Sequence, residues 1–260
     1  MAYIEIEHAT VRYGDGKNAV LALNDVSLTI EKGEFVCLIG SSGCGKTTLL
    51  NAIAGFEGLS SGSVFIDGKQ VIKPKIEYVT IFQNYGLLPW RTALKNVELG
   101  FKKIGVPKRE WEARAKKYIS QVGLEGFEDR FPHQLSGGQQ QRVAIARALA
   151  VEPDVLFMDE PFAALDPITR MKLQDDVLQL TRIHNKTIVF VTHDVEEAVF
   201  LADRIVVLAP NPGRIKGIAT VRDSKGCDRT SERFIRGRNK IFELLDMKQK
   251  TEERPIEYFI

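Results

Sequence analysis

An apolar strand that runs directly into a glycine-rich loop constrains this chain more than any other feature. The strand is predicted at residues 35–39, and a helix is predicted from Lys46, because apolar residues then recur at helical spacing as far as Ala54. Glycines in such a loop let backbone N–H groups crowd around nucleotide phosphates, Lys46 adds a mobile cation, and the Thr47 hydroxyl can ligate Mg²⁺. A glycine turn with an incidental lysine is the less specific interpretation. The predicted phosphate-binding residues are Gly40, Ser41, Ser42, Gly43, Cys44, Gly45, Lys46, Thr47 and Thr48.

The length and charge of the chain limit the remaining classes of function. With 260 residues it can bury one good core with an attached lobe, but it is short for two independent enzymes. Its 36 lysines and arginines nearly balance 34 aspartates and glutamates, and the signs are interspersed, so we expect no nucleic-acid partner. The longest apolar runs have about five residues, far fewer than the ~20 that cross a bilayer, and no basic-then-apolar leader is present. We therefore expect a cytosolic protein.

The three cysteines form an odd set without metal-ligand spacing, so reduced thiols are expected. Cys37 lies in an apolar run and is predicted to pack in the core. Cys44 lies inside the glycine-rich loop near a helix N-terminus. This position is predicted to lower the pKa of its thiol and to expose it to alkylating reagents when no nucleotide is bound.

The pattern of apolar residues predicts an α/β fold with two kinds of strand. Alternation over residues 26–30 and a hairpin pattern over 63–72 are typical of an antiparallel sheet with one solvated face. More than a hundred residues separate the glycine-rich loop from the next strongly apolar strand, and helical periodicity within them predicts an inserted helical subdomain. Near-continuous apolar runs, typical of parallel strands covered by helices on both faces, occur at 35–39, 155–158, 187–191 and 205–208.

Two adjacent carboxylates, Asp159 and Glu160, follow one of these apolar runs. The run should end at the carboxyl edge of the sheet, which places both side chains beside the phosphate loop. Asp159 can then hold Mg²⁺ directly or through water, and Glu160 can accept a proton from a water aligned with the γ-phosphate. A solvated strand end is the alternative interpretation.

A second anion-binding surface is predicted where Leu135-Ser136-Gly137-Gly138-Gln139 precedes a helix. With this motif the chain resembles the ABC-transporter ATPase family over nearly all of its length. The resemblance implies a head-to-tail pair of cassettes, in which Ser136, Gly137, Gly138 and Gln139 of one subunit close over ATP held by the phosphate loop of the other. A single chain is then expected to hydrolyse ATP poorly.

The resemblance also implies a fold and a division of the chain. The expected fold is a P-loop NTPase core of the RecA-like type, with an antiparallel β subdomain and an inserted α-helical subdomain. The cassette is expected to span residues 1–225, with core and β subdomain at about 1–83 and 152–225 and the helical subdomain at about 84–151. A C-terminal helical extension is expected at 226–260.

Four further positions match the family pattern, and their roles are implied by the resemblance alone. Gln83 resembles the glutamine that touches Mg²⁺ and the attacking water, and His193 resembles the switch histidine that hydrogen-bonds the γ-phosphate. Ala164-Leu165-Asp166 matches the loop that contacts the opposite subunit. Tyr13 stands where the family places an aromatic ring against adenine. Each also has a plain structural explanation, such as a solvated glutamine or a half-buried tyrosine.

The segment after Gln83 places Tyr85, Leu87, Leu88 and Trp90 in one loop. Loops rarely carry so much apolar surface without a partner, so this loop is predicted to help receive a short cytoplasmic helix of a membrane permease. The alternative is that these side chains pack within the helical subdomain.

Three classes of function are compatible with a phosphate loop. A GTPase is not supported, because Asn185-Lys186-Thr187-Ile188 lacks the acidic residue that recognises guanine. A small-molecule kinase is not supported, because it does not need the motif at 135–139. A family member that acts on nucleic acid or ribosomes would carry a coiled coil or a second cassette, and this chain has neither. The segments 82–91, 159–166 and 212–215 resemble the nitrate, sulfonate, taurine and bicarbonate importers, closest to the taurine type. This resemblance implies an ATPase on the cytoplasmic face of the inner membrane, with ATP and Mg²⁺ as cofactors. Its implied partners are permease subunits, a second cassette that is either another copy of this chain or a related subunit, and, indirectly, an extracytoplasmic binding protein. An exporter or a non-transport ATPase is the alternative.

Overall fold

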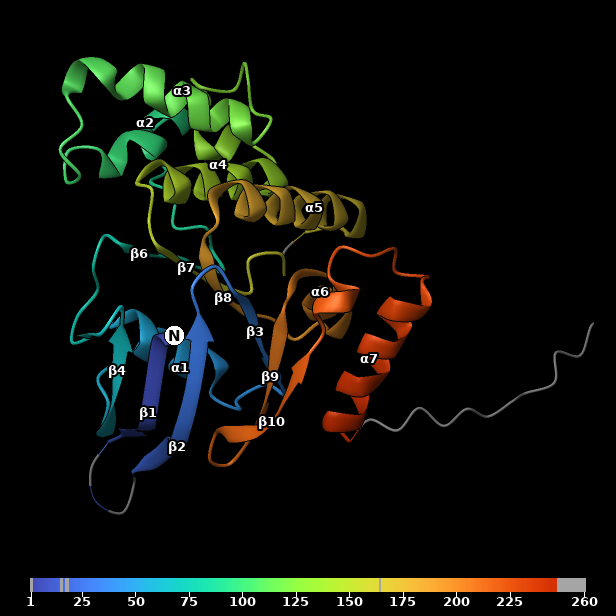
Figure 1. Cartoon of the computed structure of the whole chain (residues 1–260). Coiled ribbons are helices and arrows are strands. Elements are labelled where there is room, and N and C mark those ends of the chain that lie inside the picture. The colour runs from blue at the N-terminus through green and yellow to red at the C-terminus, as the bar shows by residue number, and fades with distance from the viewer. Residues whose placement is uncertain (1, 15, 17–18, 164, 247–260) are drawn as a thin grey trace, which may run out of the picture.

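The computed structural model describes residues 2–14, 16, 19–163 and 165–246, whose strands form two sheets (Figure 1). The smaller sheet is antiparallel, in the order β2-β1-β4-β5. Its β2 strand alternates buried and exposed residues toward its end, which agrees with the predicted solvated face. Its strands are β1 (Ala2–Tyr13), β2 (Val20–Glu31), β4 (Ser61–Ile66) and β5 (Lys69–Gln70).

The larger sheet runs in the order β10-β9-β3-β8-β7-β6. Strands β9 to β6 in this order are parallel, and β10 pairs antiparallel with β9 at the edge. Each of the four predicted parallel strands is present, and β6 and β10 extend the sheet on its two sides. The strands are β3 (Phe35–Gly40), β6 (Tyr78–Ile81), β7 (Val155–Asp159), β8 (Thr187–Val191), β9 (Arg204–Ala209) and β10 (Arg214–Thr220).

The helices divide between the sheet and a separate cluster at one end of the molecule (Figure 1). Helices α2, α3 and α4 contact one another and form this cluster, as the helical periodicity predicted. The α-helices are α1 (Lys46–Ala54), α2 (Ala93–Val97), α3 (Trp111–Gln121), α4 (Gly137–Ala150), α5 (Pro167–His184), α6 (Val195–Leu201) and α7 (Glu232–Leu244). Short 3₁₀ helices are η2 (Glu98–Gly100), η3 (Lys108–Glu110), η4 (Pro132–Gln134) and η5 (Arg222–Ser224).

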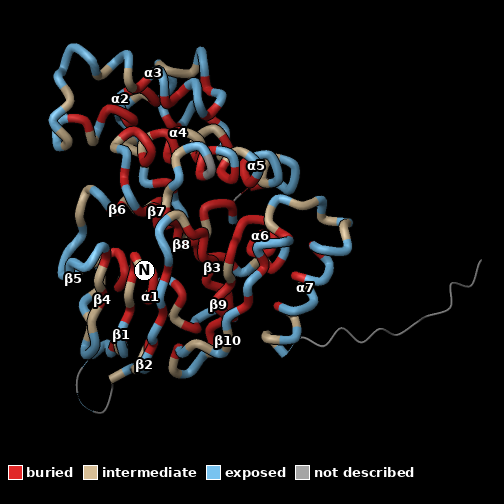
Figure 2. The backbone as a smooth tube through the Cα atoms, in the orientation of Figure 1, coloured by how far each residue is buried: buried red, intermediate tan, exposed pale blue. Residues whose placement is uncertain are grey.

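Strands β3, β7, β8 and β9 of the larger sheet are buried on both faces, because they pack into two different cores (Figure 2). Along β3, Val36 and Leu38 face one core while Cys37 and Ile39 face the other, as the two-residue period of a strand requires. Helices α4, α5 and α6 contribute to the Cys37 side. On the Val36 side the cover is α1 together with the smaller sheet, a difference from the expected cover of helices alone. The predicted α/β fold with a P-loop NTPase core is confirmed.

The end of the chain does not form a detached extension within the described residues. Helix α7 contacts α6, β9 and β10, and its Phe234 and Ile241 are fully buried. Residues 247–260 of the predicted 226–260 extension lie outside the described residues. The boundaries near residues 83, 151 and 225 stay predictions.

Candidate functional site

The phosphate loop joins a fully buried strand to a buried helix, so its two ends are fixed. All six residues of β3 are buried, and α1 buries Leu49, Leu50 and Ile53, each of which contributes roughly 1.5–3 kcal/mol. Between them, Gly43 at φ 76° and Gly45 at φ 91° adopt the left-handed backbone that glycine tolerates. A Cβ atom on Gly45 would also lie 2.6 Å from Leu23 Cδ2. The loop conformation therefore depends on glycine at this position.

Lys46 is a nearly buried cation held only by neutral groups. Its Nζ donates to the carbonyl oxygens of Gly40 at 2.9 Å and Ser41 at 3.0 Å, and the residue is 7% exposed. It makes no ion pair with any carboxylate in the described ranges. A buried ammonium without a counter-charge favours an anion in the loop.

The prediction for Cys44 is wrong. Its side chain is fully buried rather than exposed in the loop, and it packs in the core that holds α1 and Leu23. Burial raises the pKa of the Cys44 thiol above its usual value, although the nearby Lys46 opposes this shift. The side chain at this loop position points inward, so we expect its thiol to react more slowly than an exposed cysteine.

Thr47 at the start of α1 lies beside Asp159 at the end of β7, although 112 residues separate them in the chain. The Thr47 hydroxyl donates to Asp159 Oδ1 at 3.1 Å. Burial raises the pKa of Asp159, and the adjacent Glu160 adds to the shift, while the Thr47 hydrogen bond and Lys46 oppose it. Two oxygen ligands are thus placed side by side where excess negative charge is unfavourable, an arrangement that a cation would relieve.

Glu160 and His193 form the other side of the site because β7 and β8 are neighbours. Their side chains lie 3.2 Å apart, between Glu160 Oε2 and His193 Nδ1. Glu160 has φ 43°, a left-handed backbone conformation that residues other than glycine rarely adopt, and its N–H donates to Val191 O at 3.0 Å. His193 is more exposed than Glu160, with side-chain exposures of 64% and 24%. The imidazole can therefore reach a ligand that lies above the carboxylate.

A pocket of about 540 Å³ collects most of these groups. Tyr13, Glu160 and His193 line it together with the phosphate-loop residues Ser42, Gly43, Gly45, Lys46, Thr47 and Thr48. Gly40, Ser41, Cys44 and Asp159 are not part of its lining. The Tyr13 hydroxyl donates to Glu57 Oε2 at 3.0 Å. The residue is 41% exposed beside the pocket. Burial is the largest cause of the raised pKa of Tyr13.

Two stretches of the pocket wall were not predicted as site residues. They are residues 20–22 of β2 and the turn Asn211-Pro212-Gly213 between β9 and β10. Gly213 ties them together, because its N–H donates to Ala22 O at 3.0 Å and its carbonyl accepts from Asn24 N at 2.9 Å. The Pro-Gly pair was visible in the sequence as a turn, but nothing local to it indicates that the turn lies against the phosphate loop.

The residues at 136–139 do not line this pocket. Ser136 caps α4 by accepting from Gln139 N at 3.3 Å, and Gln139 Oε1 accepts from Ser136 N at 2.9 Å. Gly138 lets α4 approach α5, since a Cβ there would lie 2.5 Å from Thr169 Cγ2. Figure 1 places α4 in the helical cluster, away from α1. Within this chain, the predicted second anion-binding surface is therefore separate from the pocket.

Asp166 and Gln83 also lie outside the pocket lining. Asp166 caps α5, accepting from Thr169 N at 3.0 Å, and this hydrogen bonding lowers its pKa. Gln83 is exposed just after β6, with no hydrogen bond to another described side chain. Ala164 lies outside the described residues.

Comparisons with known proteins identify the family. The family described as ABC transporter matches residues 23–163, more than half of the chain. This chain belongs to the ABC-transporter family. Among solved structures, a dimeric ATP-binding cassette in a post-hydrolysis state bound to ADP and phosphate is similar, with a TM-score of 0.75 and 36% identity over 84% of this chain and 99% of that one. The chain is thus an ATP-hydrolysing cassette.

Three curated relatives match most of this chain over most of their own length. An uncharacterised ABC transporter ATP-binding protein of Methanocaldococcus jannaschii is 50% identical over 93% of this chain and 91% of its own length. The bicarbonate transport ATP-binding protein of Synechocystis is 46% identical over 88% and 82%, respectively. A taurine import ATP-binding protein of Escherichia coli is 49% identical over 82% of each chain. The resemblance to the taurine and bicarbonate group is confirmed by these similarities.

The residues of the cassette's pocket fit Mg²⁺ and a polyphosphate. Mg²⁺ is usually held by one or two protein oxygens together with substrate phosphates, rather than by an all-protein cage. The 3.1 Å pair of Thr47 and Asp159 offers such oxygens, and the described residues hold no cluster of three or more His, Cys, Asp or Glu that would suit another metal. No helix in the described ranges is long and apolar enough to cross a bilayer.

Proposed function

We propose that this cassette is the ATP-hydrolysing subunit of an importer for a small anionic solute, of the sulfonate or taurine, nitrate or bicarbonate type. It would act with a separate membrane permease, on its cytoplasmic face, as one of two head-to-tail cassettes, while a binding protein delivers the solute outside. The solute class is supported by the similarity to the taurine import and bicarbonate transport ATP-binding proteins. The pairing of two cassettes is supported by the similarity to a solved dimeric cassette.

One observation carries the head-to-tail arrangement. The pocket holds Lys46, Glu160 and His193, but the capped start of α4 at Ser136 is not part of its lining. The N-terminus of α4, with its unpaired N–H groups and positive dipole end, is suited to an anion. A second copy can offer this helix end to the phosphates that the pocket holds, which completes each site with groups from two chains.

The cassette's own residues divide the work of hydrolysis. Lys46 and the backbone of the phosphate loop hold the β- and γ-phosphates, and the opposing α4 terminus meets the charge that develops on the γ-phosphate. Glu160 accepts a proton from the attacking water, and His193 hydrogen-bonds the γ-phosphate. When bound by Thr47 and Asp159, with Gln83 as a further proposed ligand, Mg²⁺ supplies electrophilic stabilisation of the phosphate oxygens.

A complementation experiment tests the shared sites. Lys46→Ala and Ser136→Glu subunits should each be inactive, because each variant damages both sites of its own dimer. When they are mixed, every heterodimer keeps one intact site, so turnover should return to about a quarter of wild type if pairing is random. A mixture as inactive as its components would contradict shared sites.

Glu160→Gln tests the assigned base. Turnover should fall by at least about a hundredfold, while an ATP-bound dimer accumulates on size-exclusion chromatography. Asp129→Asn, a change in a turn of the helical region, is the control and should keep wild-type turnover. Full activity of Glu160→Gln would show that another group accepts the proton.

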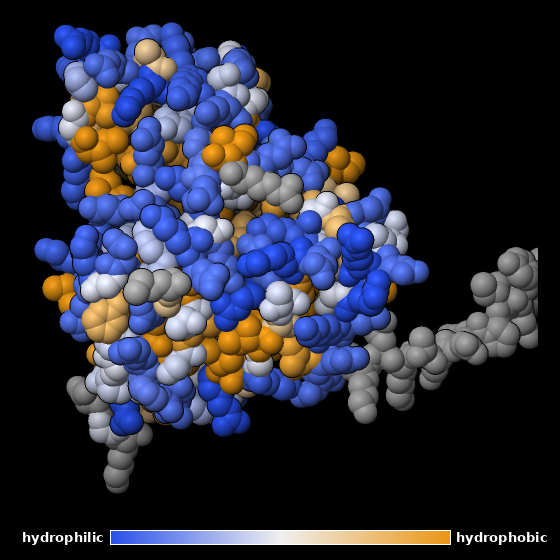
Figure 3. All heavy atoms as spheres, viewed as in Figure 1, coloured by the Kyte–Doolittle hydropathy of each residue, from blue (hydrophilic) through white to orange (hydrophobic). Residues whose placement is uncertain are grey.

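The surface around Gln83 is the proposed contact with the permease. Tyr85 and Leu87 pack against the core of the helical cluster, so for these two residues the alternative of internal packing holds. Trp90 is 70% exposed, and Phe82, which lies beside Gln83, packs edge-on against the exposed Phe56 at 5.7 Å. Figure 3 shows apolar side chains gathered on the side of the molecule that carries α2 and α3.

Trp90→Ala should reduce co-purification with the permease and leave ATP binding unchanged. Ile183→Ala is a matched control, because Ile183 at the end of α5 is 73% exposed and apolar. Equal loss of permease binding in both variants would refute a specific contact at Trp90.

A further inference from the structure

A second hollow lies between η5 and α7, away from the residues that line the nucleotide pocket. It has a volume of about 520 Å³. One wall is formed by residues 220–224, which comprise the end of β10 and η5. The other wall is one face of α7, on which positions 233, 236, 237 and 240 follow helical spacing. Its polar lining residues are Thr220, Arg222, Asp223, Ser224, Arg233, Arg236 and Lys240.

The charge of this hollow is strongly unbalanced. Four cationic side chains line it, against the single carboxylate of Asp223. The whole chain has a net charge of only +2, so the cluster is a local feature and not the consequence of a basic protein. Like charges that line one hollow repel one another, and an anion between them would reduce that repulsion. Figure 3 shows largely hydrophilic side chains over α7.

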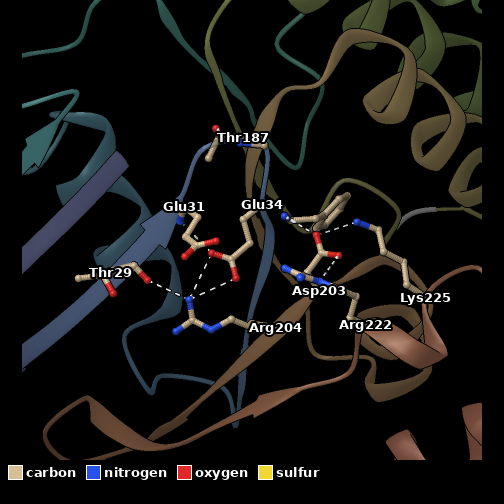
Figure 4. A network of polar contacts seen from close by, with 10 residues as sticks. Thr29, Glu31, Glu34, Thr187, Asp203, Arg204, Arg222 and Lys225 are labelled. Carbon is tan, nitrogen blue, oxygen red and sulfur yellow. Dashed lines mark hydrogen bonds and ion pairs between the residues drawn. The ribbon is translucent and has the colours of Figure 1, made fainter. Parts of the chain in front are cut away.

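The protein itself neutralises these cations poorly. Arg233 and Lys240 make no ion pair with any described residue, and Arg236 has only an exposed contact with Glu232 at 3.7 Å. Arg222 lies 3.6 Å from Asp203, but Asp203 already accepts from Lys225 Nζ at 2.8 Å and Phe35 N at 2.9 Å (Figure 4).

The two walls are held together by a close backbone contact. A Cβ atom on Gly237 would lie 2.5 Å from Ser224 Oγ, so glycine allows α7 to approach η5. The Ser224 hydroxyl donates to Arg233 O at 2.8 Å and fixes the first turn of α7 against the same wall. The backbones that carry the four cations are therefore positioned before any ligand arrives, which reduces the entropy lost on binding.

We propose that this hollow is a binding site for an oxyanion of the phosphate or sulfonate class. Guanidinium groups match such anions because their N–H donors form paired hydrogen bonds with two oxygens. The anion can come from a free small molecule or from a phospholipid headgroup, since both present the same oxygens. The site is separate from the nucleotide pocket and does not depend on the proposed import function. A merely solvated helix face would show no saturable binding here.

The test compares two variants that lose the same charge. Arg233→Gln with Lys240→Gln removes two cations of the hollow, and Lys108→Gln with Arg109→Gln removes two exposed cations near α3. Calorimetric titration with inorganic phosphate, and then sulfate, is done at low salt with the nucleotide pocket saturated by a non-hydrolysable ATP analogue and Mg²⁺. Wild type and control should bind one anion, and the Arg233/Lys240 variant should bind at least about tenfold more weakly.

A vesicle arm distinguishes the source of the oxyanion. Vesicles of phosphatidylcholine alone are compared with vesicles that also contain phosphatidylglycerol. If free phosphate and sulfate do not bind, but the anionic vesicles retain wild type and control and release the Arg233/Lys240 variant, the headgroup is the ligand. If the two variants behave alike with both free anions and vesicles, or if nothing binds, the proposal is overturned. Circular dichroism and the melting temperature check that both variants are folded.

Discussion

Replacing Asp203 by alanine should destabilise the fold by about 4 kcal/mol, because this carboxylate is a nearly buried hub at the start of β9. Its side chain is 12% exposed and accepts from Lys225 Nζ and the Phe35 N–H, and Arg222 approaches from the solvent side (Figure 4). Alanine leaves the Lys225 ammonium, 15% exposed, without its counter-charge and leaves the N–H without an acceptor.

The magnitude follows from these two losses. Breaking a buried ion pair from one side costs about 3–5 kcal/mol, and an unsatisfied buried N–H costs about 1–3 kcal/mol. The two penalties overlap because water can reach both groups once the carboxylate is gone, so about 4 kcal/mol is the expected total. For a chain of this size each kcal/mol lowers the melting temperature by about 2–4 °C, which gives a decrease of about 8–16 °C.

Urea unfolding followed by circular dichroism, together with calorimetric melting, measures this effect. Arg222→Ala is the control, because the Arg222 side chain is 64% exposed and its Nε lies 3.6 Å from Asp203 Oδ1. Its loss should lower the free energy of unfolding by at most about 1 kcal/mol. Nucleotide affinity of the folded Asp203→Ala protein should stay unchanged, because Asp203 lies at the opposite end of the sheet strands from the phosphate loop. A loss below about 1 kcal/mol would show that the network is solvated and would refute the reasoning.

Three further predictions concern the site. Asp159→Asn should abolish Mg²⁺-dependent turnover. It should also stabilise the nucleotide-free protein at pH 7, because the raised pKa of Asp159 means that the fold disfavours its charge. This gain in unfolding free energy should vanish below about pH 4, where the carboxylate is protonated in both the folded and the unfolded protein. A pH-independent gain in melting experiments would contradict that cause. Cys44 should react slowly with a maleimide with or without ATP, whereas the half-buried Cys227 reacts faster; equal rates by mass spectrometry would show that the loop opens. Gly138→Ala should cost about 1–3 kcal/mol of unfolding free energy through its clash with Thr169 Cγ2. Thr169→Ser removes that methyl group and should restore most of the loss, and no restoration would refute the clash.

Much of the fold could be predicted because its signals are local. The runs at 35–39 and 187–191 contain no charged residue and do not alternate apolar with polar positions, so they indicate strands buried on both faces. The capping box at Ser136 and Gln139 marks the start of α4 within four consecutive residues. The cover of one sheet face by a second sheet was not predicted, because either a helix or a sheet can bury an apolar face.

The sequence by itself determined the chemistry of the phosphate loop. A tight turn with left-handed glycines, a lysine and a threonine at a helix start is encoded by contiguous residues, so no long-range packing is needed to recognise it. The adjacent pair Asp159 and Glu160 was recognisable for the same reason.

Only the tertiary structure decided which of these groups meet. The strand order places β8 between β3 and β7, which brings His193 to Glu160 and Asp159 to Thr47, and folds the 211–213 turn against the pocket. It also buried Cys44, whose environment comes from strands far away in the chain, and gathered the cations of η5 and α7 around one hollow. Burial and proximity depend on contacts between distant segments, so the local pattern that specifies an element does not specify its neighbours.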